Sequence, residues 1–234
     1  MNPRPRLLAA LMRHGDYHQL PHTPSAHQPF ALNANGRQQA VAGADKLAAG
    51  LAGLGGVLEP VIDSSRLLRA WQTARLIADS LPSGAAIAEF DALAERGVGT
   101  AANLSIEQIE QVLDSDPRYP SPPTGWKADS HYQLPFPGAE SLLQAGERVA
   151  GHIRTRMSQL DSIDTAAAVR VKLFVGHGAA FRHAAYHLGV LKFHQIAMLS
   201  MYHAEPLFLE CLADGRWRQV AGHWKQRHNE AFAD

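Results

Sequence analysis

The chain has 234 residues, of which 46% are hydrophobic and 19% charged, the composition of a folded globular protein rather than a disordered one. Its 22 lysines and arginines balance its 22 aspartates and glutamates, so no net field favours nucleic acid or an anionic membrane surface. The single cysteine, Cys211, excludes an intramolecular disulfide and a cysteine-rich zinc module. No apolar stretch approaches the about 20 residues that a membrane-spanning helix needs. We therefore expect one cytoplasmic α/β domain over residues 1–234.

The first expected strand is the apolar run from Leu7 to Met12, which is too short for an independent helix. Such a run is typical of a strand that is buried on both faces of a sheet. It is followed directly by Arg13, His14 and Gly15. Because ligands of open α/β sheets bind beyond the carboxyl ends of the strands, Arg13 and His14 are expected to face a binding crevice.

Residues 16–31 are rich in proline, histidine and small polar residues, which predicts a loop over the end of this strand. Histidine recurs there at every fourth position, as in a helical metal site, but prolines interrupt the spacing: His14, His18 and His22. We therefore favour loop histidines over a metal site. Asn33 is the expected N-cap of an alanine-rich helix that ends at the glycines of residues 53–56.

Residues 60–65 predict a second strand, and residues 66–78 a helix with apolar residues at helical spacing. The strand ends in Ser64 and Ser65, and either of them is an expected N-cap for the helix. Arginines in a first helical turn oppose the macrodipole, which indicates that they serve a ligand, and such a turn is a good place to hold an oxyanion. From the residues alone, Arg66 and Arg69 are equal candidates for this role.

The segment 85–93 predicts a third strand, which leads to Glu95. Residues 97–137 then depart from the α/β alternation and contain a helix capped at Ser105 and a proline-rich loop. We expect this insertion to lie over the carboxyl-terminal edge of the sheet, where substrate-selecting elements are common. Residues 138–141 lead into an expected helix of roughly 20 residues that ends near Ser162, and its apolar stripe belongs to the core.

Residues 169–176 carry the clearest strand pattern. They are followed directly by His177 and Gly178, just as His14 and Gly15 come at the end of the first strand. A helix is expected over residues 179–187, with His183 and His187 on one face. No third metal ligand lies near them in the sequence, so we favour a packing or surface role for both. Asp214-Gly215 between two β-rich runs predicts a hairpin.

Together these elements predict a three-layer αβα sandwich around a mostly parallel central sheet. One edge of that sheet gathers two imidazoles, at least two guanidinium groups and a carboxylic acid. Guanidinium groups bind phosphate through paired, charge-assisted hydrogen bonds. A neutral imidazole is a nucleophile toward phosphorus, and a second, protonated imidazole would stabilise the transferring phosphoryl group. A nearby carboxylic acid, Glu95, could protonate the leaving alkoxide.

The chain resembles the histidine phosphatase superfamily, in the branch of cofactor-dependent phosphoglycerate mutases and related phosphatases. The matching motifs occur in family order and span nearly the whole chain: L-M-R-H-G at 11–15, L-N-A-N-G-R-Q-Q-A at 32–40, S-S-R-L-L-R-A-W-Q-T-A at 64–74, L-A-E-R at 93–96, G-A-E-S-L at 138–142 and V-G-H-G-A-A-F-R at 175–182.

The resemblance implies that His14 is the phosphorylated nucleophile and that Glu95 is the proton donor. It also implies a set of groups that bind the phosphoryl oxygens and the substrate: Arg13, Arg69, His177, the backbone N–H of Gly178, and Arg96. Arg69 thereby takes precedence over Arg66, which becomes a surface or substrate-rim residue. No metal and no cofactor are implied.

Several positions depart from the mutase pattern. Asp16 replaces a glutamate, Leu20 replaces a phosphate-binding asparagine, Val98 stands where mutases carry a tyrosine, and Arg118 is at best an echo of a pair of arginines. A mutase must hold a second phosphate and keep water from its phosphoenzyme. The sequence lacks much of that apparatus, so hydrolysis of a phosphomonoester is the favoured function.

Two alternatives stay open: a phosphoglycerate-mutase-type phosphotransferase, and a non-catalytic module that binds a phosphorylated ligand. The expected partner is a small-molecule phosphate ester, although a phosphoprotein also remains open. Residues 16–31 and 97–137 are expected to select it. The sequence does not decide between a monomer and a homodimer, and no nucleic-acid or membrane partner is expected.

Overall fold

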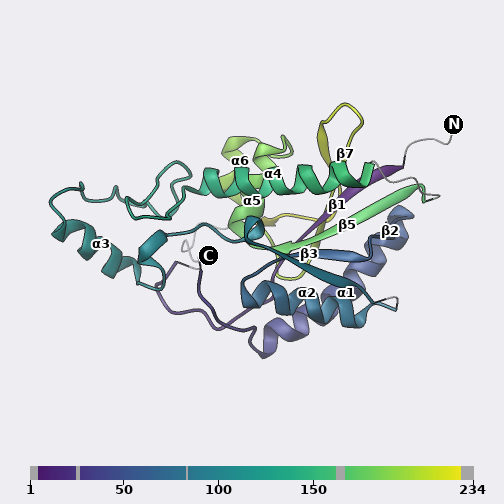
Figure 1. Ribbon diagram of the computed structural model, residues 1–234, viewed down its shortest axis with the longest axis horizontal. Coiled ribbons are helices and arrows are strands. Elements are labelled where there is room, and N and C mark those ends of the chain that lie inside the picture. The colour runs from purple at the N-terminus through teal and green to yellow at the C-terminus, as the bar shows by residue number, and fades with distance from the viewer. Residues whose placement is uncertain (1–4, 25–26, 83, 162–166, 228–234) are drawn as a thin grey trace.

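The structure, a computed structural model, describes residues 5–24, 27–82, 84–161 and 167–227. At its centre lies a 7-stranded sheet in the order β4-β3-β5-β1-β7-β8, with the short β2 also paired to β5 (Figure 1). The strands of this sheet are β1 (Arg6–Arg13), β2 (Val57–Leu58), β3 (Val61–Ser65), β4 (Ala86–Phe90), β5 (Val169–Gly176), β7 (Pro206–Cys211) and β8 (Trp217–Ala221).

The sheet is mostly parallel, as the sequence predicts. β1 pairs with β5, β5 with β2 and β3, and β3 with β4, all in parallel. β7 runs antiparallel to β1 and forms a hairpin with β8 around Gly215, which has a φ of 81°. In the register of β1 and β5, Arg13 lies opposite Gly176, so the residues that follow the two strands begin at the same edge.

Helices cover both faces of the sheet and complete three layers (Figure 1). Alternate residues of β1 supply the two cores, because successive side chains of a strand point to opposite faces. Leu7, Ala9 and Leu11 pack in the core beneath α4 (Leu142–Asp161) and α5 (Gly178–His187). The other face of β1 contributes to a second core beneath α1 (Ala34–Leu54) and α2 (Leu68–Ser80).

Local signals place three helix boundaries correctly. The Asn33 side chain caps α1 by accepting a hydrogen bond from the Gly36 N–H at 2.8 Å, and α1 ends at Gly55, which has a φ of 62°. A capping box of Ser105 and Gln108 begins α3 (Ile106–Ser115).

The predicted serine cap of α2 is wrong. Its N-cap is Leu67, which makes no side-chain cap hydrogen bond, and Arg66 lies before the helix on the surface. The predicted third strand is also too long, because β4 ends at Phe90 and a 3-10 turn, η1 (Asp91–Leu93), follows.

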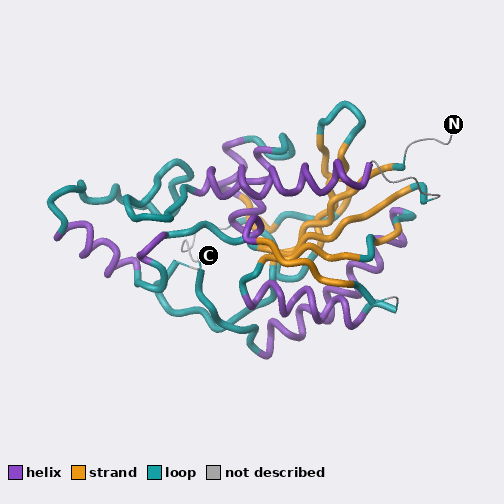
Figure 2. The backbone as a smooth tube through the Cα atoms, in the orientation of Figure 1, coloured by secondary structure: helices purple, strands orange, loops and turns teal. Residues whose placement is uncertain are grey.

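The insertion after Glu95 has a small core of its own. It contains the 3-10 turn η2 (Gly99–Ala101) and α3, and it extends to one side of the sheet in Figure 2. Trp126 is buried in that core and donates its indole N–H to Glu110 at 2.9 Å. The insertion lies beyond the carboxyl ends of the parallel strands (Figure 1).

Four short helices and strands were not predicted, because each has too few residues to show a period: β2, α6 (Phe193–Met198), β6 (Leu199–Ser200) and β9 (Lys225–Gln226). β6 and β9 pair antiparallel beside α5 and α6. Within the described part of the chain, none of the helices combines the length and the apolar character that crossing a bilayer requires.

Candidate active site

The His14 imidazole is fixed in one tautomer by the backbone that follows it. His14 comes directly after β1, its backbone N–H donates to the Gly176 carbonyl at 2.9 Å, and the residue is 3% exposed. The ring nitrogen Nδ1 lies 2.6 Å from the carbonyl oxygen of Gly15. A carbonyl oxygen can only accept, so Nδ1 carries the proton and Nε2 presents a lone pair. Nε2 is therefore the nucleophilic atom of this imidazole.

The guanidinium group of Arg69 links His14 to His177. Its Nε donates to His14 Nε2 at 3.2 Å, and its Nη2 lies 3.3 Å from His177 Nδ1. The two imidazole rings are 5.1 Å apart between centroids. His177 Nε2 lies 2.9 Å from the Ser65 hydroxyl, which also accepts from the Leu67 N–H at 3.3 Å. The carboxyl ends of β1, β3 and β5 thus place these groups around one point.

Burial and neighbouring positive charge keep both imidazoles neutral. Burial lowers the pKa of His14 well below its ordinary value, and the positive charge of Arg69 adds to this effect. The same two causes lower the pKa of His177 well below its ordinary value. Before a ligand binds, His14 is consequently an unprotonated nucleophile at neutral pH. His177 is neutral as well, whereas the sequence analysis assumed a protonated second imidazole.

Arg13 and Gly178 lie against each other at the same edge. A Cβ atom on Gly178 would lie 3.1 Å from Cδ of Arg13, so the glycine leaves room for the arginine to pass. Arg13 Nη1 donates to the carbonyl of Met201 at 3.2 Å. His203 Nδ1 lies 2.7 Å from the His14 carbonyl oxygen, so the segment after β6 holds both residues of the Arg-His pair.

Two glycines allow the loop after β1 to approach the start of α1. A Cβ atom on Gly15 would lie 2.4 Å from the Gly36 carbonyl oxygen, and one on Gly36 would overlap the backbone of Asp16. Asp16 accepts a hydrogen bond from the Asn33 side chain at 2.8 Å. This contact fixes the loop that carries the Gly15 carbonyl, and through it the tautomer of His14.

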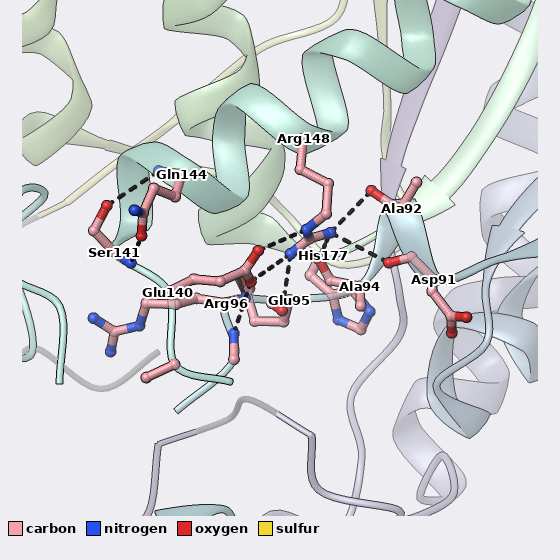
Figure 3. Close-up of polar contacts among 12 residues, drawn as sticks. Asp91, Ala92, Ala94, Glu95, Arg96, Glu140, Ser141, Gln144, Arg148 and His177 are labelled. Atoms are coloured by element: carbon pink, nitrogen blue, oxygen red, sulfur yellow. Dashed lines mark hydrogen bonds and ion pairs between the residues drawn. The ribbon is translucent and has the colours of Figure 1, made fainter. Parts of the chain in front are cut away.

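Glu95 lies beside His177, at the start of the segment that follows β4 and η1 (Figure 3). The residue is 6% exposed. Oε1 accepts from the Arg96 N–H at 2.9 Å, and Oε2 accepts from the Ala179 N–H at 3.2 Å. The first residues of α5 therefore bring the carboxyl group to the same edge as the two imidazoles. Arg96, which is 7% exposed, lines a cavity that Glu95 also lines.

Arg148 on α4 braces the backbone that carries Glu95 (Figure 3). Its Nη1 donates to the carbonyls of Ala92 at 2.9 Å and Ala94 at 3.1 Å. Nη2 and Nε donate to the Glu140 carboxylate at 2.7 and 2.8 Å. Glu140 in turn accepts from the Gly97 N–H at 3.1 Å. The pair thus holds the backbone on both sides of Glu95.

Replacing Arg148 with methionine should lower kcat by about 10-fold or more, because a small displacement of a proton donor is costly. The change should spare the affinity for inorganic phosphate, since Arg148 does not contact His14 or Arg69. Steady-state kinetics and phosphate binding by calorimetry measure both effects. An equal loss of kcat and phosphate affinity would contradict this positioning role.

The structure brings the predicted residues together, but several of their partners were missed. Tyr17 packs edge-on against His14, with centroids 5.3 Å apart, and the Arg69 guanidinium lies 4.5 Å from its ring centroid. Arg69 Nη1 also donates to the Gln28 carbonyl at 2.8 Å. Both partners lie in the loop after β1, which has no periodic pattern to assign them. Glu140 belongs to a motif that was noted, but its role depends on a contact with α4.

The other histidines that were considered as metal ligands have different surroundings. His183 is buried between the Ala179 carbonyl, 2.7 Å from Nδ1, and the Ser130 hydroxyl, 3.0 Å from Nε2. His187 Nε2 lies 3.0 Å from the Leu143 carbonyl. His18 and His22 are exposed loop residues. Across the residues that the structure describes, no group of three potential metal ligands is found.

Comparisons with known proteins identify the family of the chain and its fold. The family described as histidine phosphatase superfamily (branch 1) matches residues 9–223. A mycobacterial glucosyl-3-phosphoglycerate phosphatase superposes with a TM-score of 0.67 at 22% identity, covering 92% of this chain and 96% of that one. The alpha-ribazole phosphatase from Shigella flexneri has a TM-score of 0.67 at 18% identity, covering 92% and 94% of the two chains. A search of curated proteins gave no significant match.

These structures show the same fold at low identity, and the family match covers most of the chain, including every residue of the site described above. The chain belongs to branch 1 of the histidine phosphatase superfamily.

Proposed function

We propose that the protein is a phosphatase that hydrolyses a small phosphomonoester through a phosphohistidine on His14. The supporting observation is the His14 imidazole itself. Its Nδ1 is committed to the Gly15 carbonyl, and its Nε2 faces Arg69 and His177. A neutral nucleophile that faces a buried cation suits attack on a phosphate ester, whose oxygens the cation would bind.

In the first step, the phosphoryl group would lie between Arg13, Arg69 and His177. The guanidinium N–H groups that now reach the imidazoles would turn to the phosphoryl oxygens. His14 Nε2 forms a bond to phosphorus as the ester P–O bond breaks, and Glu95, as a carboxylic acid, gives its proton to the leaving oxygen. The products are a phosphorylated His14, a free alcohol and a carboxylate at Glu95.

In the second step, water attacks the phosphorus and the P–N bond breaks. The Glu95 carboxylate takes a proton from that water, so the same group serves as acid and then as base. Inorganic phosphate leaves, and His14 and Glu95 return to their starting states. This cycle uses only side chains that the structure brings to one edge of the sheet.

Hydrolysis is better supported than a mutase reaction. Arg118, the residue that echoes the mutase arginines, is 75% exposed on its side chain and forms an ion pair with Asp116 at 2.6 Å. Leu20 in the loop after β1 is half-buried and offers no side-chain donor for a second phosphate.

We place the enzyme in the cytoplasm, since a chain with one cysteine needs no oxidising compartment to fold.

A panel of phosphate esters tests this function directly. Wild-type protein should release inorganic phosphate from at least one ester in the presence of EDTA, because no step above uses a metal. Conversion of phosphoglycerate isomers in the presence of the bisphosphorylated cofactor, without phosphate release, would instead indicate a mutase. Tight binding of an ester without turnover would indicate a non-catalytic module.

Replacing Glu95 with glutamine should lower the rate of alkyl ester hydrolysis by about 10²- to 10⁴-fold, the usual contribution of a general acid. Aryl esters with acidic leaving groups need little protonation, so their first step should be much less affected. A stopped-flow burst of the aryl alcohol followed by slow turnover would show that dephosphorylation also depends on Glu95. Equal losses in the rate of the first step for both ester classes would argue against a proton-donor role.

A further inference from the structure

The backbone of His14 is held from both sides at the end of β1. On the side of β5, its N–H donates to the Gly176 carbonyl at 2.9 Å. On the other side lies the segment between β6 and β7, which contains His203. Nδ1 of His203 lies 2.7 Å from the His14 carbonyl oxygen, and because a carbonyl can only accept, this nitrogen carries the proton. His203 therefore donates a hydrogen bond to the backbone of the proposed nucleophile.

The segment that carries His203 is itself fixed in place. The Ala204 N–H donates to the Arg13 carbonyl at 2.8 Å. The Ala204 carbonyl oxygen packs against Gly43 of α1, where a Cβ atom would come within 2.5 Å of it. Ala204 is 1% exposed and has a φ of 52°, a left-handed conformation that residues other than glycine adopt only when their surroundings require it. Tight packing thus maintains a strained turn directly after His203.

The hydrogen bond from His203 holds one end of the peptide group that joins His14 to Gly15. The N–H at the other end of this group donates to the Thr73 hydroxyl at 3.0 Å. Thr73 is fully buried on α2, and its hydroxyl donates to the Arg69 carbonyl at 2.8 Å. The C=O and the N–H of a trans peptide group point in opposite directions, so the two contacts together fix its plane.

These contacts matter because Gly15 has no Cβ atom to restrict its own dihedral angles. The Gly15 carbonyl lies 2.6 Å from His14 Nδ1 and decides which ring nitrogen carries the proton. The N–H of the peptide group that contains this carbonyl donates to the Gln39 side chain at 2.8 Å. The preceding peptide group depends on the contact with His203. The direction of the Gly15 carbonyl is therefore set by anchors on both sides of the glycine.

His203 is neutral at pH 7. Burial and the positive charge of Arg13 lower its pKa to about 4, and Lys225 adds to this effect. The hydrogen bond to the His14 carbonyl and the charge of Asp16 oppose it. The centroid of the His203 ring lies 5.6 Å from that of His14. The single ring proton of His203 is thus committed to the backbone beside the nucleophile.

We propose that His203 is a positioning residue for the nucleophile. By holding the peptide group between His14 and Gly15, it keeps the Gly15 carbonyl directed at Nδ1 and leaves the lone pair of Nε2 to attack phosphorus. The inference rests on the proposed phosphatase function and adds a residue that does not touch the phosphoryl group. His203 lies outside the motifs that the chain shares with the family.

Three replacements separate the hydrogen bond from the imidazole ring. His203→Asn keeps an N–H donor in the place of Nδ1, because both nitrogens are attached to Cγ, whereas His203→Leu and His203→Ala have no donor. The two donor-free variants should lower kcat for phosphate release by about 10- to 100-fold, and His203→Asn by less than about threefold, since a small displacement of a reacting group is costly. The Kd of inorganic phosphate should stay within about threefold of wild type in all three.

His187 provides the matched control. It is half-buried like His203, and its Nε2 lies 3.0 Å from a backbone carbonyl, that of Leu143. It lies at the end of α5 that is farther from the active site, so His187→Leu should leave kcat unchanged. A thermal melt of each variant separates a loss of folded protein from a loss of activity.

A second measurement does not depend on turnover. In protein that carries isotope-labelled histidine, nitrogen NMR shows which ring nitrogen of His14 holds the proton, and His14→Gln identifies its signals. Wild type and His203→Asn should have the proton on Nδ1 alone. His203→Leu and His203→Ala should show a mixture of the two tautomers, because the Gly15 carbonyl is then held from one side only.

An unchanged His14 tautomer in the folded donor-free variants would overturn the proposal, whatever their kcat. Equal losses of kcat in His203→Asn and His203→Leu would also overturn it, because the imidazole itself would then take part in the reaction. If wild type hydrolyses no ester, the phosphatase function fails, but the tautomers of the variants still decide whether His203 positions His14.

Discussion

Replacing His14 with alanine should lower phosphatase kcat by a factor of about 10⁴ or more, because it removes the imidazole that is proposed to form the bond to phosphorus. The substitution removes the imidazole Nε2 and leaves Arg13, Arg69 and His177 in place. Steady-state phosphate release from the best ester of the panel measures the loss. Turnover within about tenfold of wild type would contradict the assignment of His14 as nucleophile.

Binding of inorganic phosphate is the control for this variant. The groups proposed to hold the phosphoryl oxygens are retained, so calorimetry should give a Kd within about tenfold of the wild-type value. A thermal melt confirms that the variant is folded. Loss of both phosphate binding and turnover would show instead that His14 supports the site structurally.

The second large effect concerns stability. Asp63 on β3 is fully buried and contacts three cationic or basic groups. The distances are 2.6 Å to Lys172 Nζ, 2.7 Å to Arg156 Nε and 3.0 Å to His152 Nε2. Lys172 is 3% exposed on its side chain, so Asp63→Asn leaves an ammonium group buried without a counter-ion. We expect the free energy of unfolding to fall by about 3–5 kcal/mol.

Urea denaturation measures this loss, and Asp79→Asn is its matched control. Asp79 pairs with Arg75 on α2, but the two side chains are 52% and 56% exposed. Exposed pairs contribute little, so the control should change the unfolding free energy by less than about 0.5 kcal/mol. Similar losses of unfolding free energy in the two variants would show that the burial of the Asp63 cluster does not determine the size of the effect.

The loss should also depend on pH. Burial alone raises the pKa of Asp63, but hydrogen bonds from His152, Arg156 and Lys172 outweigh it and hold the pKa below its ordinary value. A carboxyl group with a depressed folded pKa stabilises the protein above its unfolded pKa of about 4, and this contribution is lost as the pH falls through the folded value. The difference between wild type and Asp63→Asn should therefore shrink as the pH falls below about 4.

Sequence reasoning was most successful where the signal is local. The uninterrupted apolar run of residues 7–12 predicted β1 as a buried strand, and the strand pattern of residues 169–176 predicted β5. The register that pairs Arg13 with Gly176 explains why His14 and His177 meet. Asn33 and Ser105 identified two helix starts, because a cap is a contact between residues three positions apart.

Contacts between distant segments escaped prediction. Ser65 was expected to cap α2, but its hydroxyl faces His177, a residue more than a hundred positions away. The brace from Arg148 to the Ala92 and Ala94 carbonyls depends on how α4 lies across η1, which a helical pattern does not encode. Tyr17 and Gln28 lie in a loop whose path is fixed by Arg69. In each case the missing information is tertiary packing.

The most direct measurement is the identity of the phosphorylated atom. The enzyme is denatured at alkaline pH during turnover of its best ester, and the phosphorylated peptide is mapped by mass spectrometry and examined by NMR. Because Nδ1 of His14 donates to the Gly15 carbonyl, the phosphoryl group should be on Nε2 of His14. A phosphoryl group on Nδ1 or on a different residue, or hydrolysis without any phosphoenzyme, would contradict the account.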